Sequence, residues 1–175
     1  MNAVKAQLVK GFTLIEAMIV VAVFGVLLAL AAPPLTDFLE SVQARQNTND
    51  LLGSILLARS EAIARNSTIS MCMIREGHED HCHDDGWHGG WILFEDLDDD
   101  GDRDSDEEII HQYSGMSETS TVTSAEFDES LTYLPSGAVP TTGILTICSG
   151  STARQIVIYA TGRPRLSDAS CPAPP

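Results

Sequence analysis

Residues 11–36 read GFTLIEAMIVVAVFGVLLALAAPPLT, and this stretch decides the fold. After Glu16 the next charged residue is Asp37, so 20 consecutive residues carry no charge, and most of them are Ala, Val, Leu or Ile. A helix of that length spans a hydrocarbon layer of about 30 Å. Residues 1–11 contain Lys5 and Lys10 and no acidic residue. The positive-inside rule therefore predicts a cytoplasmic N-terminus and an exported remainder.

Composition limits the class of protein. The chain has 175 residues, a formal net charge of −15 and 43% hydrophobic residues. These values predict one domain, or one domain with an appendage, rather than two full domains, and they argue against wholesale disorder. The apolar run argues against an ordinary soluble cytoplasmic enzyme. Acidity argues against a general nucleic-acid binder, because phosphate contacts need clustered Lys and Arg. The chain has no nucleophile elbow, P-loop or zinc-protease motif, so we predict no enzymatic activity.

Downstream of the apolar run, the pattern predicts an α+β domain with an antiparallel sheet. The helix is expected to run from about Phe12 to about residue 65, where Asn66-Ser67 supplies a stop. Its second half should pack on the sheet through an apolar stripe, formed by Leu35, Phe38, Leu39, Val42, Leu52, Ile55, Leu56 and Ile63. Strand-like stretches follow at residues 68–74, 91–94, 108–113, 130–134, 144–148 and 155–159. The Ser- and Thr-rich segment 115–123 is typical of a surface loop.

The cysteines all lie in the predicted exported part, at Cys72, Cys82, Cys148 and Cys171. An even number in an oxidising compartment predicts two disulfides, for which three connectivities are possible. We expect one bond between Cys72 and Cys82, closing a short loop over a His-rich segment. The second bond is expected between Cys148 and Cys171, pinning the C-terminal tail to a strand.

An acidic segment fits the calcium-loop pattern D-x-D-x-D-G-x₅-E, in which alternate oxygens converge on one ion and Gly101 permits a sharp turn. The segment follows a strand-like stretch rather than a helix, so a solvated hairpin turn is the alternative. We expect the protein to require no cofactor, and calcium is the candidate ligand of this segment. The candidate ligands are Asp96, Asp98, Asp100, Asp102, Asp104 and Glu107.

A second group of possible metal ligands lies just upstream and consists of His78, His81, His83 and His88. Imidazoles beside carboxylates could bind Zn²⁺ or Cu²⁺. Their spacing matches no established site, so an exposed polar loop is favoured.

The hexapeptide Gly11-Phe12-Thr13-Leu14-Ile15-Glu16 closely resembles the processing site of type IV prepilins and type II secretion pseudopilins. The resemblance implies that prepilin peptidase removes residues 1–11 and that Phe12 is N-methylated. Residues 12–35 would then form a transmembrane and fibre-core helix, and residues 36–175 an exported globular domain. In pilins the glutamate matching Glu16 is thought to pair with the N-terminal amine of a neighbouring subunit. A carboxylate inside a membrane segment is functional by default, because burying it costs free energy.

Later motifs, taken in order, resemble the GspH/FimT family of minor pilins and pseudopilins. They are Gly90-Trp91-Ile92-Leu93-Phe94 with Asp96, Asp106-Glu107-Glu108-Ile109, Ser136-Gly137 and Gly162-Arg163-Pro164-Arg165. The resemblance implies a type IV pilin-like fold, with a long N-terminal helix packed on antiparallel sheet. It also implies a non-enzymatic minor pilin that contributes to the assembly or priming of a type IV pilus, or lies at its tip.

The implied partners are other pilins or pseudopilins, prepilin peptidase and the inner membrane. The implied location is the inner membrane, crossed once with the C-terminal domain in the periplasm, and afterwards a pilus or pseudopilus. The first alternative function is a pseudopilin of a type II secretion system. The alternative of another class is a membrane-tethered calcium-binding protein or DNA-uptake receptor. An element matching Arg163 and Arg165 is linked to DNA uptake in FimT-like proteins, but we expect little DNA binding because the rest of the surface repels phosphate.

Overall fold

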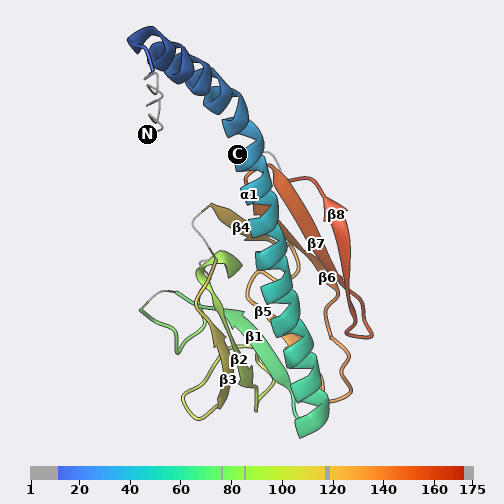
Figure 1. Cartoon of the computed structure of the whole chain (residues 1–175). Coiled ribbons are helices and arrows are strands. Elements are labelled where there is room, and N and C mark those ends of the chain that lie inside the picture. The colour runs from blue at the N-terminus through green and yellow to red at the C-terminus, as the bar shows by residue number, and fades with distance from the viewer. Residues whose placement is uncertain (1–11, 76, 85, 117–118, 172–175) are drawn as a thin grey trace, which may run out of the picture. The chain divides into compact units, whose positions relative to one another are not determined.

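The computed structural model describes residues 12–75, 77–84, 86–116 and 119–171. The chain divides into two compact units, Met1–Thr36 and Asp37–Pro175. A single helix, α1 (Leu14–Arg65), precedes the strands of the second unit (Figure 1). The predicted α+β architecture, with a long helix ahead of antiparallel strands, is confirmed. Residues 1–11, the predicted leader, lie outside the described residues.

The helix ends where the sequence predicts. Asn66 has a positive φ of 54°, and the amide of Ser67 donates to the carbonyl oxygen of Ala62 at 3.3 Å. This six-residue closure is the Schellman arrangement, in which one left-handed residue lets the chain satisfy the last helical carbonyls. Asparagine tolerates that conformation better than most residues other than glycine.

The strands of the second unit form two antiparallel four-stranded sheets. The first sheet has the order β3-β2-β1-β5 and contains β1 (Ile69–Met73), β2 (Trp91–Glu95), β3 (Ile109–Tyr113) and β5 (Ser130–Tyr133). The second has the order β4-β6-β7-β8 and contains β4 (Ser120–Thr123), β6 (Gly143–Ser149), β7 (Thr152–Ile158) and β8 (Pro164–Ala169). A short 3-10 helix, η1 (Trp87–Gly89), precedes β2. In the centre of the first sheet, Met71 lies opposite Leu93 and Leu131.

Two strands were not predicted. The segment expected to be a loop, residues 115–123, contains β4, in which Ser120 and Val122 are buried and alternate with exposed Thr121 and Thr123. Threonine suits a pleated strand, so the surface-loop prediction is wrong for those residues. The edge strand β8 begins at Pro164, which is tolerated as a first strand residue because it need not donate to a ladder. Most side chains of β8 are exposed. The sequence there therefore lacks the alternation of hydrophobic and polar residues by which strands were predicted.

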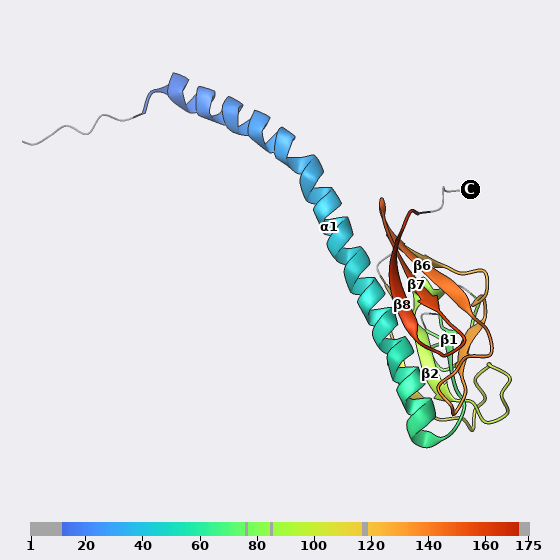
Figure 2. The same ribbon diagram turned by 90° about the vertical axis from the view of Figure 1, so that its right-hand side faces the viewer.

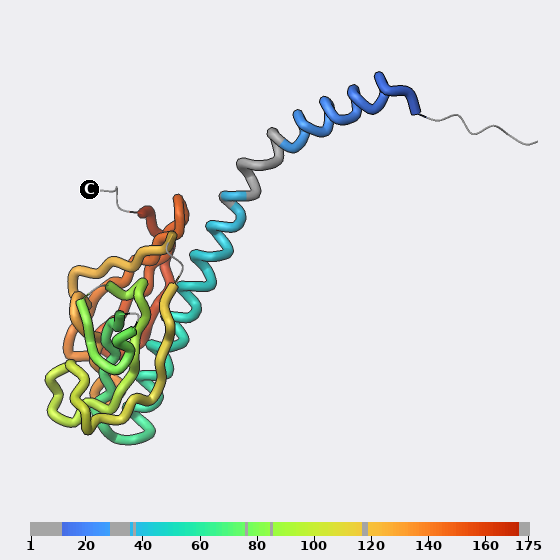
Figure 3. The backbone as a smooth tube through the Cα atoms, turned by 90° about the vertical axis from the view of Figure 1, so that its left-hand side faces the viewer, coloured from blue at the N-terminus to red at the C-terminus, as the bar shows by residue number. Residues whose placement is uncertain are grey.

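One hydrophobic core joins the helix to both sheets of the second unit. From residue 37 onward, α1 lies along one side of the strands (Figure 2), and the tube in Figure 3 shows this from the opposite direction. The helix contributes Ala44, Leu51, Ile55, Ala58 and Ala62, all fully buried. The sheets contribute Ile69, Met71, Trp91, Leu93, Leu131, Tyr133, Leu145, Ile147, Ile156 and Ile158.

The predicted apolar stripe is not the face that packs. Of its members, Ile55 is buried and Leu52 half-buried, whereas Phe38, Leu39, Val42, Leu56 and Ile63 are exposed. The buried face combines Leu51 and Ile55 with small and polar residues in helical phase, including Ala44, Asn47, Thr48 and Ala58. Beside Leu51 and Ile55, the small side chains let the helix approach the sheets closely, whereas Phe38, Leu39 and Leu56 lie off this face and are exposed.

The central strand β1 is buried on both faces. Ile69, Met71 and Met73 belong to the main core. Cys72 belongs instead to a second cluster with Ile74, Ile92 and Phe94, against which Cys82 and Ile109 pack. The first sheet is therefore covered by the helix on one side and by loops on the other, and those loops carry the acidic segment and the His-rich segment.

Membrane insertion stays a prediction. The backbone of residues 14–35, within the segment expected to cross the membrane, is helical. Within the part of the chain that the structure describes, no helix combines the length and the apolarity that a membrane crossing needs.

Candidate functional site

The predicted processing site lies at the start of α1. Gly11 is outside the described residues, and Phe12 is 90% exposed. The amide of Thr13 donates to Glu16 Oε2 at 2.9 Å, and the amide of Glu16 donates to Thr13 Oγ1 at 3.3 Å. This is a capping box, in which the two side chains satisfy helix-terminal amides reciprocally. In the isolated subunit Glu16 therefore bonds to its own helix end and is exposed for further contacts.

The N-terminal part of the helix presents large apolar side chains to the outside. Glu16 is the single charged residue among residues 12–28, all of which are exposed. Contiguous apolar surface of this kind is typical of a lipid- or protein-facing segment. Its larger members are Phe12, Leu14, Ile15, Met18, Ile19, Val20, Val21, Val23, Phe24, Val26, Leu27 and Leu28.

Near the C-terminal end of α1, two motifs that resemble the family elements meet. Arg59 Nε donates to the carbonyl oxygen of Gly137 at 2.9 Å, and its Nη2 lies 3.5 Å from the carbonyl oxygen of Thr161. Gly162 has a φ of 70°, and a Cβ there would overlap the Gly137 carbonyl. The two turns therefore lie against each other, which requires glycine at position 162.

Tyr133 extends the same contact. Its hydroxyl donates to the carbonyl oxygen of Gly162 at 3.1 Å. Burial raises the pKa of Tyr133, and the charge of Arg59 offsets part of that rise. The phenol is thus held neutral as a donor. The sequence pattern missed Arg59, because its partner is a backbone carbonyl 78 positions along the chain, which leaves no motif.

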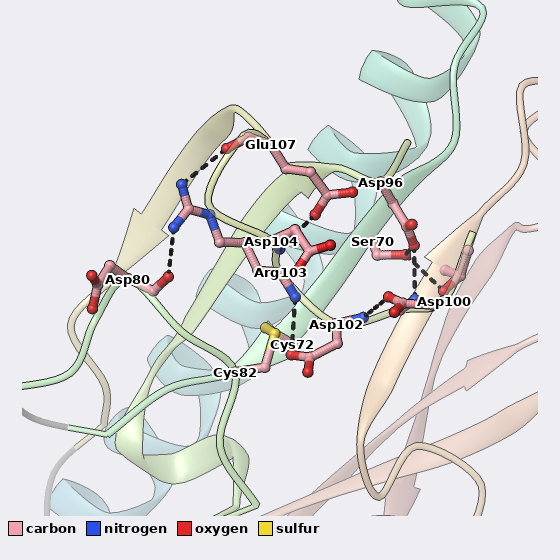
Figure 4. The surroundings of a disulfide bond; sticks show 12 residues. Ser70, Cys72, Asp80, Cys82, Asp96, Asp100, Asp102, Arg103, Asp104 and Glu107 are labelled. Atoms are coloured by element: carbon pink, nitrogen blue, oxygen red, sulfur yellow. Dashed lines mark hydrogen bonds between the residues drawn. A yellow bond between two sulfur atoms is a disulfide. The ribbon is translucent and has the colours of Figure 1, made fainter. Parts of the chain in front are cut away.

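The cysteines are joined as expected, Cys72 with Cys82 and Cys148 with Cys171. The first bond holds the loop after β1 against the outer face of the first sheet. Arg103 connects that loop to the acidic segment, because its Nη1 donates to the carbonyl oxygen of Asp80 and its Nη2 to that of Glu107, each at 3.0 Å (Figure 4).

The acidic segment gathers three of its six candidate ligands. One carboxylate oxygen from each of Asp96, Asp98 and Glu107 lies within 4.8 Å of the other two. Asp100 and Asp102 turn to the loop backbone instead. Asp100 Oδ1 accepts from the Asp102 amide at 2.8 Å, and Asp102 Oδ1 accepts from the Arg103 amide at 2.9 Å.

Asp104 lies outside this group of three and is exposed. The upstream histidines do not converge on a common centre within the described residues. His78, His81 and His88 are exposed and His83 is half-buried. Their arrangement is that of a polar loop.

Arg163 directly precedes β8, an edge strand of the second sheet, and Arg165 is the second residue of that strand. Both are exposed, and neither forms a salt bridge with any other described residue. Arg154, on the neighbouring strand, lies 3.9 Å from Asp168. The structure therefore presents two free cations at this edge, with an acidic residue further along the same strand.

Comparison with known families identifies this combination of apolar helix and two-sheet domain. Residues 47–162 match the family model described as type II transport protein GspH. The chain belongs to the GspH family. Residues 8–32 match the prokaryotic N-terminal methylation motif, so the GspH domain follows a prepilin-type N-terminus. The predicted membership among type IV minor pilins and pseudopilins is confirmed.

This GspH-family chain is similar to one pilin-like protein in sequence and to a minor pilin and a minor pseudopilin in fold. It is 32% identical over 164 residues to the pilin-like protein PilA1 of Thermus thermophilus, covering 90% of this chain and 97% of that one. The fold is similar to that of the type IV minor pilin FimU of Pseudomonas aeruginosa, with a TM-score of 0.60, 21% identity and coverage of 77% and 96% of the two chains. It is also similar to the minor pseudopilin EpsH from the type 2 secretion system of Vibrio cholerae, with a TM-score of 0.51, 16% identity and coverage of 72% and 97%.

The GspH family and the methylation motif indicate a membrane-anchored, pilus-associated protein. Pilins and pseudopilins are structural subunits, so the family implies assembly with other pilin subunits. The exposed apolar helix is the surface on which such assembly can be built.

Proposed function

We propose that the chain is a non-enzymatic minor pilin, which is processed at its N-terminus, held in the inner membrane and then built into a type IV pilus. The observation that carries the proposal is the exposed apolar start of α1, which holds Glu16 as its single charge ahead of a folded domain. A surface of that size is unstable in water. It is stable in a bilayer or among identical helices.

Processing follows from the same segment. Prepilin peptidase would cleave after Gly11, and the new N-terminus at Phe12 would be methylated. The basic residues before the apolar run favour a cytoplasmic N-terminus, so the domain from residue 36 would lie in the periplasm before assembly.

Glu16 would set the axial position of the subunit. A carboxylate in an apolar bundle is stable only when a positive group pairs with it. The amine of a neighbouring subunit's first residue is such a group. Glu16 reaches no cation in the described structure and bonds only to Thr13, so it is available for an intermolecular pair.

The second half of α1 would add contacts closer to the domain. Phe38 and Leu39 are 61% and 57% exposed on the outer side of the helix. Because the helix packs on the sheets through another face, which holds Ala44, Leu51 and Ile55, these side chains are left for a neighbouring subunit. They extend the assembly surface beyond the segment proposed for the membrane.

A type II secretion pseudopilin is the second candidate function, favoured by the match to the GspH model and by the fold shared with EpsH. Deletion of the gene distinguishes the minor pilin from the pseudopilin. Loss of twitching with normal secretion supports the pilus, whereas loss of enzyme secretion with normal twitching supports the pseudopilus.

Maturation is tested by mass spectrometry of the protein isolated from membranes. The proposal expects a chain that begins at methylated Phe12. An intact leader, or cleavage after Ala31 or Ala32, would contradict it.

Assembly is tested by Glu16→Ala. Processing should continue, but incorporation into filaments should fall strongly, because a neighbour's amine would lose its counter-charge. Glu61→Ala, which removes a glutamate from the same helix, is the control and should be incorporated normally. Equal incorporation of both variants would reject the role given to Glu16.

A further inference from the structure

Three carboxylates meet where the chain leaves β2 and returns toward β3. Asp96 follows β2 directly and is 2% exposed, and Glu107 is 4% exposed. Asp98 lies between them in the sequence and is exposed. In Figure 4 the Glu107 side chain extends toward Asp96. Two of three like charges are therefore held together away from water, where their repulsion is poorly screened.

One oxygen of this group has no partner. Asp96 Oδ2 accepts from Ser70 Oγ at 2.5 Å and from the Gly101 amide at 3.1 Å. Asp96 Oδ1 is buried and accepts no hydrogen bond from any described residue. A buried carboxylate oxygen without a donor or a cation is costly. This unpartnered oxygen belongs to Asp96, whose other oxygen is held in place by Ser70 and Gly101.

Among the residues that the structure describes, no arginine forms a salt bridge with this group. The described salt bridges serve other carboxylates, those of Glu61, Glu95, Glu108 and Asp168 with arginine, and that of Asp80 with His81. Arg103 is close in sequence, but its guanidinium donates to two backbone carbonyls. Within the described part of the chain, no salt bridge compensates the negative charge of the group.

We propose that Asp96, Asp98 and Glu107 bind one Ca²⁺ ion. Calcium takes oxygen ligands at about 2.3–2.6 Å, so two ligands on opposite sides of one ion are separated by about 4.6–5.2 Å. One carboxylate oxygen of each residue lies within 4.8 Å of the other two, so all three are close enough together to reach one ion of that size. Calcium also accepts irregular geometry and water ligands, whereas Mg²⁺ demands a near-ideal octahedron. A loop that supplies three carboxylates at uneven spacing favours calcium.

The ligand set is narrower than the loop pattern suggests. Positions 1, 3 and 12 of the pattern converge, whereas Asp100, at position 5, accepts from the loop backbone. Gly101 has a φ of 81°, and a Cβ there would lie 2.6 Å from Ser130 Oγ. This glycine lets the loop amide reach Asp96 and so orients the anchoring carboxylate.

The ion would order two loops at once. The Glu107 carboxylate accepts from the amides of Leu97 and Asp104, at 2.7 Å and 2.9 Å. The carbonyl oxygen of Glu107 also accepts a hydrogen bond from Arg103. The same guanidinium donates to the carbonyl oxygen of Asp80, in the loop closed by the Cys72–Cys82 bond. Fixing Glu107 therefore fixes the contact between the acidic segment and the disulfide loop.

The test is calorimetry and thermal unfolding of the full-length protein in detergent, titrated with CaCl₂ after removal of metal by chelation. We expect one ion per chain, with a Kd of about 10⁻⁴–10⁻³ M, and a higher unfolding temperature in millimolar CaCl₂. Magnesium chloride should bind at least about tenfold more weakly. Absence of both heat and thermal shift with calcium, or equal binding of magnesium, would overturn the proposal.

Variants locate the ion. Asp96→Asn and Asp98→Asn should each weaken calcium binding at least about tenfold, the loss expected when a charged ligand becomes neutral. Asp98 is exposed and has no described hydrogen bond, so its variant should fold even if the Asp96 variant does not. Asp106→Asn is the control, because it removes an exposed carboxylate next to Glu107. Loss of affinity in this control equal to that of Asp98→Asn would indicate diffuse attraction to an acidic surface and reject the site.

Discussion

Arg59 Nε donates a hydrogen bond to the carbonyl oxygen of Gly137, 2.9 Å away. The two residues are 78 positions apart in the chain. The bond connects the helix to the turn after β5, against which the turn before β8 packs through Gly162. A single guanidinium thus fixes the helix to the loops of both sheets.

Arg59→Met should therefore destabilise the domain. The thioether side chain keeps much of the apolar stem but leaves the Gly137 carbonyl without its donor, at an expected cost of about 1–3 kcal/mol in the free energy of unfolding. Chemical denaturation followed by circular dichroism measures this. Arg45→Met is the control on an exposed position of the same helix and should change stability by less than about 0.5 kcal/mol. Equal effects would show that the Gly137 contact contributes nothing.

Loss of the Cys72–Cys82 bond should destabilise the disulfide loop and the strand below it. The double variant Cys72→Ser/Cys82→Ser should lose about 2–4 kcal/mol, because the cross-link restricts the unfolded chain. Chemical denaturation compares it with the double variant Cys148→Ser/Cys171→Ser, whose longer loop predicts a loss at least as large. Peptide mapping without reduction checks the pairing, and a link between Cys72 and Cys148 or between Cys82 and Cys171 would contradict it.

Alkaline pH should weaken the contact between β3 and the helix. Burial and the hydrogen bond that Tyr113 donates to Asp50 raise the pKa of Tyr113 to about 12. In the unfolded chain the tyrosine hydroxyl ionises at about pH 10. Between about pH 10 and 12, unfolding therefore releases a proton, and the free energy of unfolding falls as the pH rises. Below about pH 10 the contribution is present in full.

Tyr113→Phe tests this dependence. The variant keeps the ring stacked on Trp91, 4.3 Å between centroids, and lacks the ionising hydroxyl. We expect lower stability at neutral pH but a shallower fall above about pH 10, measured as the urea midpoint across that range. Tyr159→Phe, at a ring that is 48% exposed, is the control. Identical alkaline slopes in Tyr113→Phe and the wild type would contradict the assignment.

DNA binding should be weak at physiological salt. Arg163 and Arg165 offer few phosphate contacts, and affinity that rests on such contacts falls steeply with salt. The chain carries a net charge of −15, and loss of Lys5 and Lys10 with the leader would make it more negative. A gel-shift assay at about 150 mM salt should detect no micromolar complex. Binding that disappears in Arg163→Ala/Arg165→Ala would instead support a role in DNA uptake.

The architecture was predictable where local pattern and tertiary packing agree. Helical periodicity and Asn66 place the end of α1, and alternation locates most strands. The packing face was mispredicted because hydrophobicity alone weights Phe38 and Leu56 above Ala58 and Thr48. Close approach to a sheet depends on side-chain size, which a count of apolar residues does not capture.

The candidate site was predictable as a segment but not as a geometry. The D-x-D-x-D-G spacing marks the loop, yet which carboxylates converge depends on backbone turns. Asp100 is drawn to the amide of Asp102, and Glu107 is positioned by the amides of Leu97 and Asp104. Arg59 has no motif of its own, since its partner is a backbone carbonyl far along the chain.

The bond between Cys148 and Cys171 has a mechanical consequence. It encloses β7 and β8 in a covalent ring, so a force that pulls the two ends of a subunit apart bypasses both strands. The 23 positions between the cysteines correspond to roughly 80 Å of extended chain that cannot be drawn out. The ring at Cys72 and Cys82 withholds a further 10 positions, or roughly 35 Å. In a filament under tension, a subunit whose sheets gave way would still lengthen less than its number of residues allows.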